Sequence, residues 1–141
     1  ARTPMQWNAE KNAGFTTGTP WLVVNPCYPE VNVAAQEEDP DSILNFYRRV
    51  IRLRKEYPIV VYGSYELLYP EHDTIYAYER ILGHEKLLVV CNFAGEDIDL
   101  EVPAEFAEKS AKLLISNYPA AEIDRTLHLQ PYETRVYHIE G

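Results

Sequence analysis

The residues best suited to chemistry lie at the start of the chain, in the stretch Ala-Arg-Thr-Pro-Met-Gln-Trp at residues 1–7. Arg2 supplies a guanidinium that is always charged and offers several fixed hydrogen-bond donors. No helical or strand period runs through the stretch, so it predicts an ordered loop, and ordered loops on a rigid scaffold often carry function. By residue type alone, the simpler interpretation of Arg2 is a surface arginine near a chain end.

Other groups with catalytic or metal-binding chemistry are scattered along the chain. No histidine lies at metal-ligand spacing from another histidine or a cysteine, and many carboxylates fall in turns, where solvation is the default. The sequence also lacks a nucleophile elbow, a phosphate-binding glycine loop and a paired-cysteine motif. We therefore expect no metal site, no cofactor and no catalytic residue in these residues. The four histidines are His72, His84, His128 and His138.

The charge balance excludes one class of partner. The 141 residues carry 22 acidic and 13 basic side chains, a net charge of −9, whereas a nucleic-acid binder needs a basic surface. No apolar run approaches the roughly 20 residues that span a bilayer, so no membrane partner is expected. Cys27 and Cys91 stand far apart in the sequence and predict free thiols of a cytoplasmic protein.

Residues 1–40 predict a long ordered loop. Asparagine, glycine and proline interrupt the segment too often for a helix, while its aromatic residues argue against disorder. The apolar run at 21–24 suggests a brief strand or a buried extended piece. Met5 and Trp7 are expected to anchor a small core of the loop's own.

Residues 41–57 predict one amphipathic helix. Asp39 is the expected N-cap, Pro40 the first helical residue, and Pro58 the residue that ends the helix. Apolar side chains recur at spacings of three and four, and without a partner surface this stripe predicts self-association. Cations gather in the C-terminal half of the helix, where they suit the helix dipole better than a phosphate site.

From residue 61 onward the pattern is that of a mainly β fold. Short runs separated by turn residues predict an antiparallel β-sandwich, in which 86–92 is a central strand covered on both faces. Residues 74–81 alternate, with Ile75, Ala77 and Glu79 on one face, and residues 104–110 allow at most one helical turn. The predicted strands are 64–69, 74–81, 86–92, 97–102, 111–116, 126–129 and 133–139.

Tyrosines gather on the first two of these strands. Tyr65, Tyr69, Tyr76 and Tyr78 are candidates for a sugar-binding patch, although cross-strand packing is the commoner reason for such tyrosines.

A series of short motifs carries a resemblance to a known family. The motifs are the stretch at 1–7, Lys-Asn-Ala-Gly-Phe-Thr-Thr-Gly at 11–18, Pro-Trp at 20–21, Val-Asn-Pro at 24–26, Val-Asn-Val at 31–33, Asp-Pro-Asp-Ser-Ile at 39–43 and Leu-Arg-Lys at 53–55. Together they closely resemble the α-amylase family (glycoside hydrolase family 13), in the branch of oligo-1,6-glucosidases, α-glucosidases and trehalose-6-phosphate hydrolases. The resemblance is dense over residues 1–63 and mostly architectural beyond.

The resemblance implies that residues 1–60 end a catalytic (β/α)8 barrel, with an active-site loop at 1–40 and the last barrel helix at 41–57. Residues 61–141 would be the C-terminal β-sandwich. The implied activity is that of a retaining, exo-acting α-glucosidase on α-1,6 or α-1,4 glucosyl bonds of short oligosaccharides. The nucleophile and the acid/base lie on motifs that this chain lacks, so the chain itself is expected to be inactive and to meet its substrate through the rest of the barrel.

The resemblance also assigns one site residue. In this branch the arginine of Arg-Thr-Pro-Met-Gln-Trp lies at the bottom of the pocket, pairs with an upstream aspartate and contacts the non-reducing-end glucose. Carried over, this makes Arg2 the substrate-binding residue. Two alternatives stay open: a non-catalytic carbohydrate-binding or structural β-sandwich module, and a trehalose-6-phosphate hydrolase as the parent enzyme.

Overall fold

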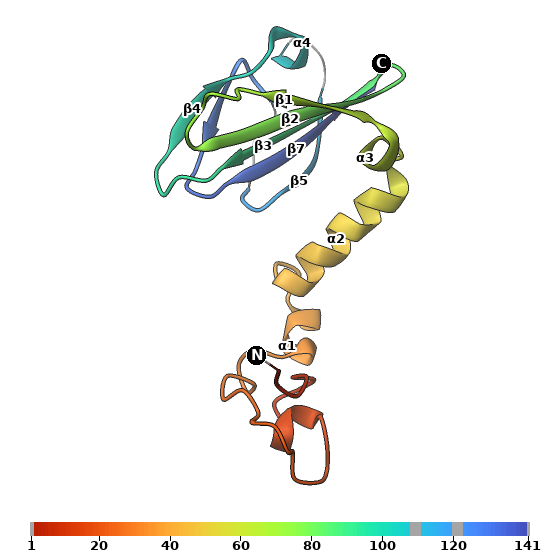
Figure 1. The fold of residues 1–141 in the computed structure, drawn as a ribbon, viewed down its shortest axis with the longest axis vertical. Coiled ribbons are helices and arrows are strands. Elements are labelled where there is room, and N and C mark those ends of the chain that lie inside the picture. The colour runs from red at the N-terminus through yellow and green to blue at the C-terminus, as the bar shows by residue number, and fades with distance from the viewer. Residues whose placement is uncertain (1, 108–110, 120–122, 141) are drawn as a thin grey trace. The chain divides into compact units, whose positions relative to one another are not determined.

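The computed structural model describes residues 2–107, 111–119 and 123–140 (Figure 1). The chain divides into two units, residues 1–51 and 52–141. Among the described residues no helix is both long and apolar enough to span a bilayer.

The first unit is mostly irregular backbone, but it is not the helix-free loop that the sequence predicts. A short 3-10 helix, η1, spans Lys11–Gly14, and a six-residue helix, α1, spans Val33–Glu38. Asn32 caps α1, since its Oδ1 accepts the backbone N–H of Ala35 at 2.9 Å. The prediction was wrong here because so short a helix shows no apolar stripe.

Helix α2 spans Ile43–Glu56, so the predicted helix at 41–57 is present with a different start. Ser42 takes the capping role, because its Oγ accepts the N–H of Asn45 at 3.2 Å. Asp39 instead closes the turn before the helix by accepting the N–H of Asp41 at 2.9 Å. The assignment of Asp39 as N-cap and Pro40 as first helical residue was therefore wrong.

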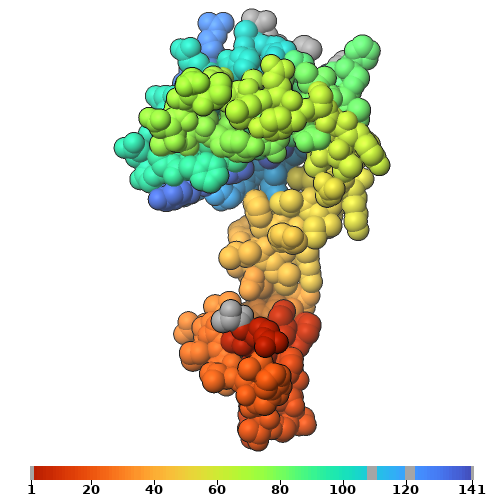
Figure 2. Space-filling model, in the orientation of Figure 1, coloured from red at the N-terminus to blue at the C-terminus, as the bar shows by residue number. Residues whose placement is uncertain are grey.

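The apolar face of α2 is open to solvent. The exposed fractions are 83% for Ile43, 65% for Tyr47, 41% for Val50 and 43% for Ile51. In Figure 2 the orange-to-yellow atoms of this helix lie at the visible surface. The first unit as a whole buries little apolar surface: Ala13 is its one fully buried hydrophobic residue among those described.

The second unit is the predicted antiparallel β-sandwich. Each of the seven predicted strands is present, with ends that agree to within one residue. One sheet has the order β1-β2-β3-β7-β5 and the other pairs β4 with β6. The strands are β1 Ser64–Leu68, β2 Ile75–Leu82, β3 Glu85–Asn92, β4 Ile98–Glu101, β5 Lys112–Ser116, β6 Thr126–Leu129 and β7 Thr134–Ile139.

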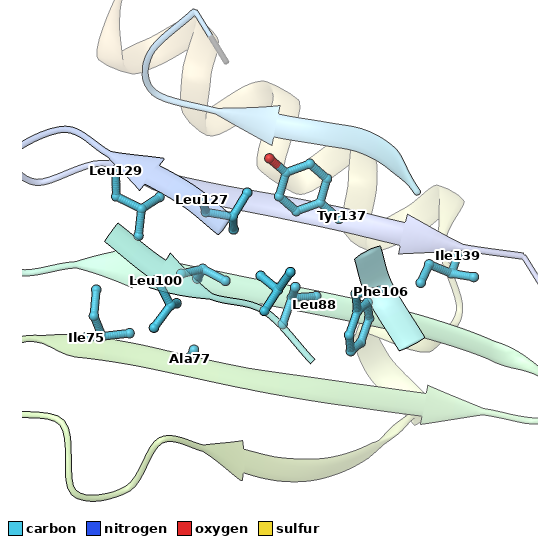
Figure 3. Close-up of a cluster of buried hydrophobic side chains, with 11 residues drawn as sticks. Ile75, Ala77, Leu88, Leu100, Phe106, Leu127, Leu129, Tyr137 and Ile139 are labelled. Carbon is cyan, nitrogen blue, oxygen red and sulfur yellow. The ribbon is translucent and has the colours of Figure 1, made fainter. Parts of the chain in front are cut away.

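Strand β3 is central and covered on both faces, as its apolar sequence predicts. Leu88 and Val90 join the core between the two sheets, while Leu87 and Val89 pack on the other face. Figure 3 shows the core side, where Leu100, Leu127 and Leu129 from the small sheet face the residues of the large one. The alternation of β2 is also confirmed, since Ile75, Ala77 and Glu79 are buried and Tyr76 is exposed.

Two short helices complete the second unit. Helix α4, Ala104–Ala107, is the single helical turn expected between 104 and 110 as far as the described residues reach, and it places Phe106 in the core. Helix α3, Ile59–Tyr62, follows Pro58 and was not predicted. It covers the outer face of the large sheet through Ile59, and Arg80 fixes it by donating to the carbonyls of Ile59 and Gly63 at 3.0 and 2.7 Å.

A buried ion pair stabilises the end of the sandwich. The Glu133 side chain is fully buried and accepts from Arg135 Nε at 2.6 Å and from the Gln130 backbone N–H at 2.8 Å. Arg135 also donates to the carbonyl of His128 at 2.6 Å. Burial lowers the pKa of Arg135, but hydrogen bonds to Glu133 and Tyr137 outweigh it, so the net pKa is raised.

This pair yields the first prediction. Arg135→Met should lower the free energy of unfolding by about 3–5 kcal/mol, because it leaves Glu133 as an unpaired buried charge. Urea denaturation of the 141-residue chain, followed by circular dichroism, measures the loss. Adding Glu133→Gln removes the stranded charge and should recover a large part of it.

The matched control is Arg48→Met, which breaks a pair with Glu37 whose side chains are both 50% exposed. Its cost should stay below about 1 kcal/mol, as for other exposed ion pairs. Equal losses for Arg135→Met and Arg48→Met would contradict the importance of the buried pair.

Candidate functional site

Hydrogen bonds from residues 6–7 to residues 31–34 hold the opening segment in place. Gln6 accepts the N–H of Val33 at 2.9 Å through its backbone carbonyl, and Trp7 accepts that of Ala34 at 3.0 Å. The Gln6 side-chain amide donates from Nε2 to the carbonyl of Val31 and lies 3.6 Å from the Cys27 sulfur. These contacts join residues 6–7 to the start of α1.

On its other side the segment meets a tight turn. Trp7 and Asn8 both donate their N–H groups to the carbonyl of Ala13, at 2.9 and 3.3 Å. Asn12, Ala13 and Gly14 all have left-handed backbones, with φ of 57°, 60° and 65°. The Asn12 side chain supports this turn by donating to the carbonyls of Thr16 and Gly18 at 3.1 and 2.9 Å.

A cavity of about 250 Å³ lies between the opening segment and the start of α1. It is lined by Thr3, Pro4, Met5, Gln6, Val31, Asn32, Val33 and Gln36. Its lining offers amide, hydroxyl and backbone groups but no carboxylate or histidine, so the lining residues supply no acid or base for catalysis.

Arg2 stands at the free end of this arrangement. Its side chain is exposed, and within the part of the chain that the structure describes it makes no hydrogen bond or ion pair. The guanidinium is therefore available to a carboxylate or to sugar hydroxyls that come from elsewhere.

Comparison with known proteins assigns the chain to a family. Residues 1–63 match the model of the α-amylase catalytic domain, and residues 65–136 match that of the maltogenic amylase C-terminal domain. The chain belongs to the α-amylase family. It is 47% identical over 99% of its length to an oligo-1,6-glucosidase of Parageobacillus thermoglucosidasius, and 50% identical over 97% to one of Halalkalibacterium halodurans.

A solved structure of this family supports the same assignment. The trehalose-6-phosphate hydrolase of Bacillus licheniformis covers 99% of this chain with a TM-score of 0.89 and 41% identity. The match takes up 26% of that protein, and those to the two glucosidases take up 25% of each. The chain thus spans about a quarter of the length of the relatives it matches.

The structure separates the four candidate tyrosines. Tyr65, Tyr76 and Tyr78 lie together on the outer face of β1 and β2, with ring centroids 5.3 Å apart for Tyr65–Tyr78 and 5.6 Å for Tyr76–Tyr78. The hydroxyls of Tyr65 and Tyr76 are 3.2 Å apart, and burial raises the pKa of Tyr78. Tyr69 lies elsewhere, against the core, with its hydroxyl donating to the carbonyl of Glu101.

The four histidines lie in three different surroundings. His72 Nδ1 accepts the N–H of Ile75 at 3.1 Å, and His128 pairs with Asp99 at an exposed position. His84 and His138 line a cavity of about 600 Å³ at the end of the sandwich where β3 begins, opposite to the Glu133–Arg135 pair, and Glu85 lies 3.1 Å from His138 Nε2 there. Among the described residues no group of three or more histidine, cysteine, aspartate and glutamate side chains is placed to hold a metal ion.

Two expectations about the loop were wrong. Met5 and Trp7 are 49% and 50% exposed, so they do not form a core of the loop's own. In the run at 21–24, Trp21 and Val23 are 86% and 81% exposed and no strand forms. The residues that do hold the loop are amides, and sequence reasoning missed them although asparagines and glutamines are frequent there.

The turn at Gly14 yields a prediction. A Cβ there would lie 2.5 Å from Asn8 Oδ1 on a left-handed backbone, so Gly14→Ala should open the turn that binds Trp7. We expect the Trp7 and Asn8 amides to exchange hydrogen at least about tenfold faster, equivalent to about 1.4 kcal/mol. Gly18→Ala is the control, because its Cβ would meet Thr16 Oγ1 at an ordinary 3.7 Å. Equal exchange in both variants would refute this role of Gly14.

Proposed function

We propose that the chain is the C-terminal part of a retaining, exo-acting α-glucosidase that hydrolyses α-1,6 or α-1,4 glucosyl bonds of short oligosaccharides. The observation that carries the proposal is the 47–50% identity to oligo-1,6-glucosidases, which continues over 97–99% of the chain. In that enzyme the nucleophile and the acid/base belong to the preceding part of the barrel. This chain contributes substrate binding and support.

The domain division proposed with this function places the end of the catalytic barrel at residues 1–60 and the β-sandwich at 61–141. The two family matches, which meet between residues 63 and 65, support this division. The exposed apolar face of α2 supports it as well, because a barrel helix packs one face against its sheet.

Arg2 is proposed as the substrate-binding residue of the chain. Its guanidinium is exposed and unpaired within the described residues, while the backbone four residues later is fixed. A planar fork of donors can bind a carboxylate and a sugar hydroxyl together, and so can orient the terminal glucose toward the catalytic carboxylates.

Activity measurements on the full-length protein test this role. Arg2→Ala should lower kcat/KM for isomaltose at least about tenfold, since a hydrogen bond to a charged group contributes about 1.5–3 kcal/mol. Arg2→Lys should recover only part, because an ammonium lacks the fork. Arg48→Ala, at an exposed position on α2, is the control and should retain activity. The isolated 141-residue chain should not hydrolyse a chromogenic α-glucoside; turnover above background would contradict the proposal.

Trehalose 6-phosphate is the alternative substrate. The similarity to the solved hydrolase of Bacillus licheniformis is the reason for testing it beside the oligosaccharides. Comparing kcat/KM of the full-length protein for isomaltose, maltose and trehalose 6-phosphate decides among the three. The proposal predicts the highest value for one of the two glucosyl oligosaccharides.

A second candidate function is a non-catalytic carbohydrate-binding module. Tyr65 and Tyr76 favour it, since both rings are about half exposed, at 52% and 43%. It predicts saturable binding of an isomalto-oligosaccharide to the 141-residue chain by calorimetry, lost in a Tyr65→Ala, Tyr76→Ala variant. No heat of binding would leave the tyrosines with a packing role alone.

Self-association is proposed for the isolated chain. The unburied apolar face of α2 favours pairing, because each fully buried large apolar side chain contributes about 1.5–3 kcal/mol. Light scattering should detect dimers, and Ile43→Glu with Tyr47→Glu should shift the chain to monomer. A monomer before substitution would contradict this.

A cytoplasmic location is also proposed. Cys27 and Cys91 are both free, and free cysteines are typical of reducing compartments.

A further inference from the structure

Gln6 is the first fixed point of the chain after Arg2. Within the described residues, Arg2, Thr3, Pro4 and Met5 make no hydrogen bond, whereas Gln6 is bonded through both its backbone and its side chain. The backbone carbonyl accepts from Val33 at 2.9 Å, and the side-chain amide donates to the carbonyl of Val31. The direction in which Arg2 leaves the loop is therefore set at Gln6.

The link from Gln6 back to Arg2 is three residues long and contains one proline. Pro4 is buried and its ring fixes φ near −65°, which removes one of the torsions between the two residues. The cavity of about 250 Å³ lies along this link, so the hydrogen bonds of Gln6 support the segment together with the buried Pro4. A displacement of the backbone at Gln6 would therefore move the start of this link and, with it, Arg2.

The side chain of Gln6 has to be a donor. Its partner, the carbonyl of Val31, can only accept a hydrogen bond. A glutamate carboxylate at position 6 would place a second acceptor opposite this carbonyl, and the two oxygens would repel each other. Methionine has nearly the same shape and no donor, and so removes the bond while keeping the volume.

We propose that Gln6 is a positioning residue for substrate binding, which holds the Arg2-bearing segment against residues 31–34 and thereby directs the guanidinium toward the sugar. The inference rests on the proposed function of Arg2. It assigns to Gln6 no contact with the substrate, and it predicts that the effect of Gln6 on catalysis passes through Arg2.

A double-mutant cycle in the full-length protein tests this coupling. Gln6→Met should lower kcat/KM for isomaltose about 10- to 100-fold, the range expected when a binding group is displaced by about 1 Å. In an Arg2→Ala background the same substitution should change kcat/KM less than about twofold, because the group that it positions is gone. Gln6→Met is used in place of Gln6→Glu, because a glutamate four residues from Arg2 would add a carboxylate that could pair with the guanidinium.

Gln36→Met is the matched control. Gln36 lines the same cavity, but its Oε1 accepts the N–H of Leu44 at 3.0 Å and serves the start of α2. Its substitution should lower stability without lowering kcat/KM. An equal loss for Gln6→Met in both Arg2 backgrounds would reduce Gln6 to a stabilising residue and overturn the proposal, as would no loss at all.

Hydrogen exchange in the 141-residue chain separates this inference from the proposed function. Gln6→Met should speed exchange of the Val33 and Ala34 amides at least about tenfold, and Gln36→Met should not. If exchange of these two amides is unchanged, Gln6 does not hold the segment against residues 31–34, and the proposal is overturned whatever the activity measurements show. Faster exchange, together with unchanged kcat/KM in Arg2→Ala, would show that Gln6 holds the segment but that Arg2 does not bind substrate. That outcome would also overturn Gln6 as a positioning residue for substrate.

Discussion

A long segment without strands must still satisfy its backbone N–H and C=O groups, and in the first unit amide side chains do part of this, beside backbone–backbone bonds such as that from Val33 to Gln6. Gln6 donates to Val31, Asn12 to Thr16 and Gly18, and Asn32 caps α1 while donating to Tyr28. At the start of α2, the side-chain amide of Asn45 likewise donates to the carbonyls of Gln36 and Asp39. The course of the loop and the start of the helix both depend on these bonds.

Because hydrogen bonds rather than apolar packing order the first unit, its apolar residues can be exposed while its backbone stays fixed. Trp21, Val23 and Ile43 are each more than 80% exposed, while the polar Asn32 and Ser42 are buried. The second unit is built in the opposite way, around apolar residues of two facing sheets. A unit ordered by hydrogen bonds has apolar surface left over, and such surface is available for packing against other protein, as the proposed place of residues 1–60 in a barrel requires.

The sequence predicted the sheets well because period-two alternation and turn residues are local signals. Strand β3 could be recognised as central from its unbroken apolar run. Helices α1 and α3 were missed because six and four residues are too few to show a period, and the start of α2 was misplaced because Asp39 and Ser42 are both good caps.

For the site, residue types alone favoured a surface arginine at position 2, and only the family resemblance singled out Arg2 as a candidate substrate-binding residue. Neither could point to Gln6, whose partners lie 21 and 25 residues away.

The groups that hold residues 6–8 are uncharged, and this affects which partners Arg2 can bind. A loop held by aspartate or glutamate side chains would place carboxylates within reach of the guanidinium, and an ion pair inside the loop would compete with any external partner. The groups that fix residues 6–8 are instead backbone carbonyls, backbone amides and one glutamine. The carboxylate nearest in sequence is Glu10, which forms no ion pair within the described residues, while Glu37 is occupied by Arg48. A neutral support thus leaves the Arg2 guanidinium without an ion-pair partner among the described residues of the loop, as its proposed role requires.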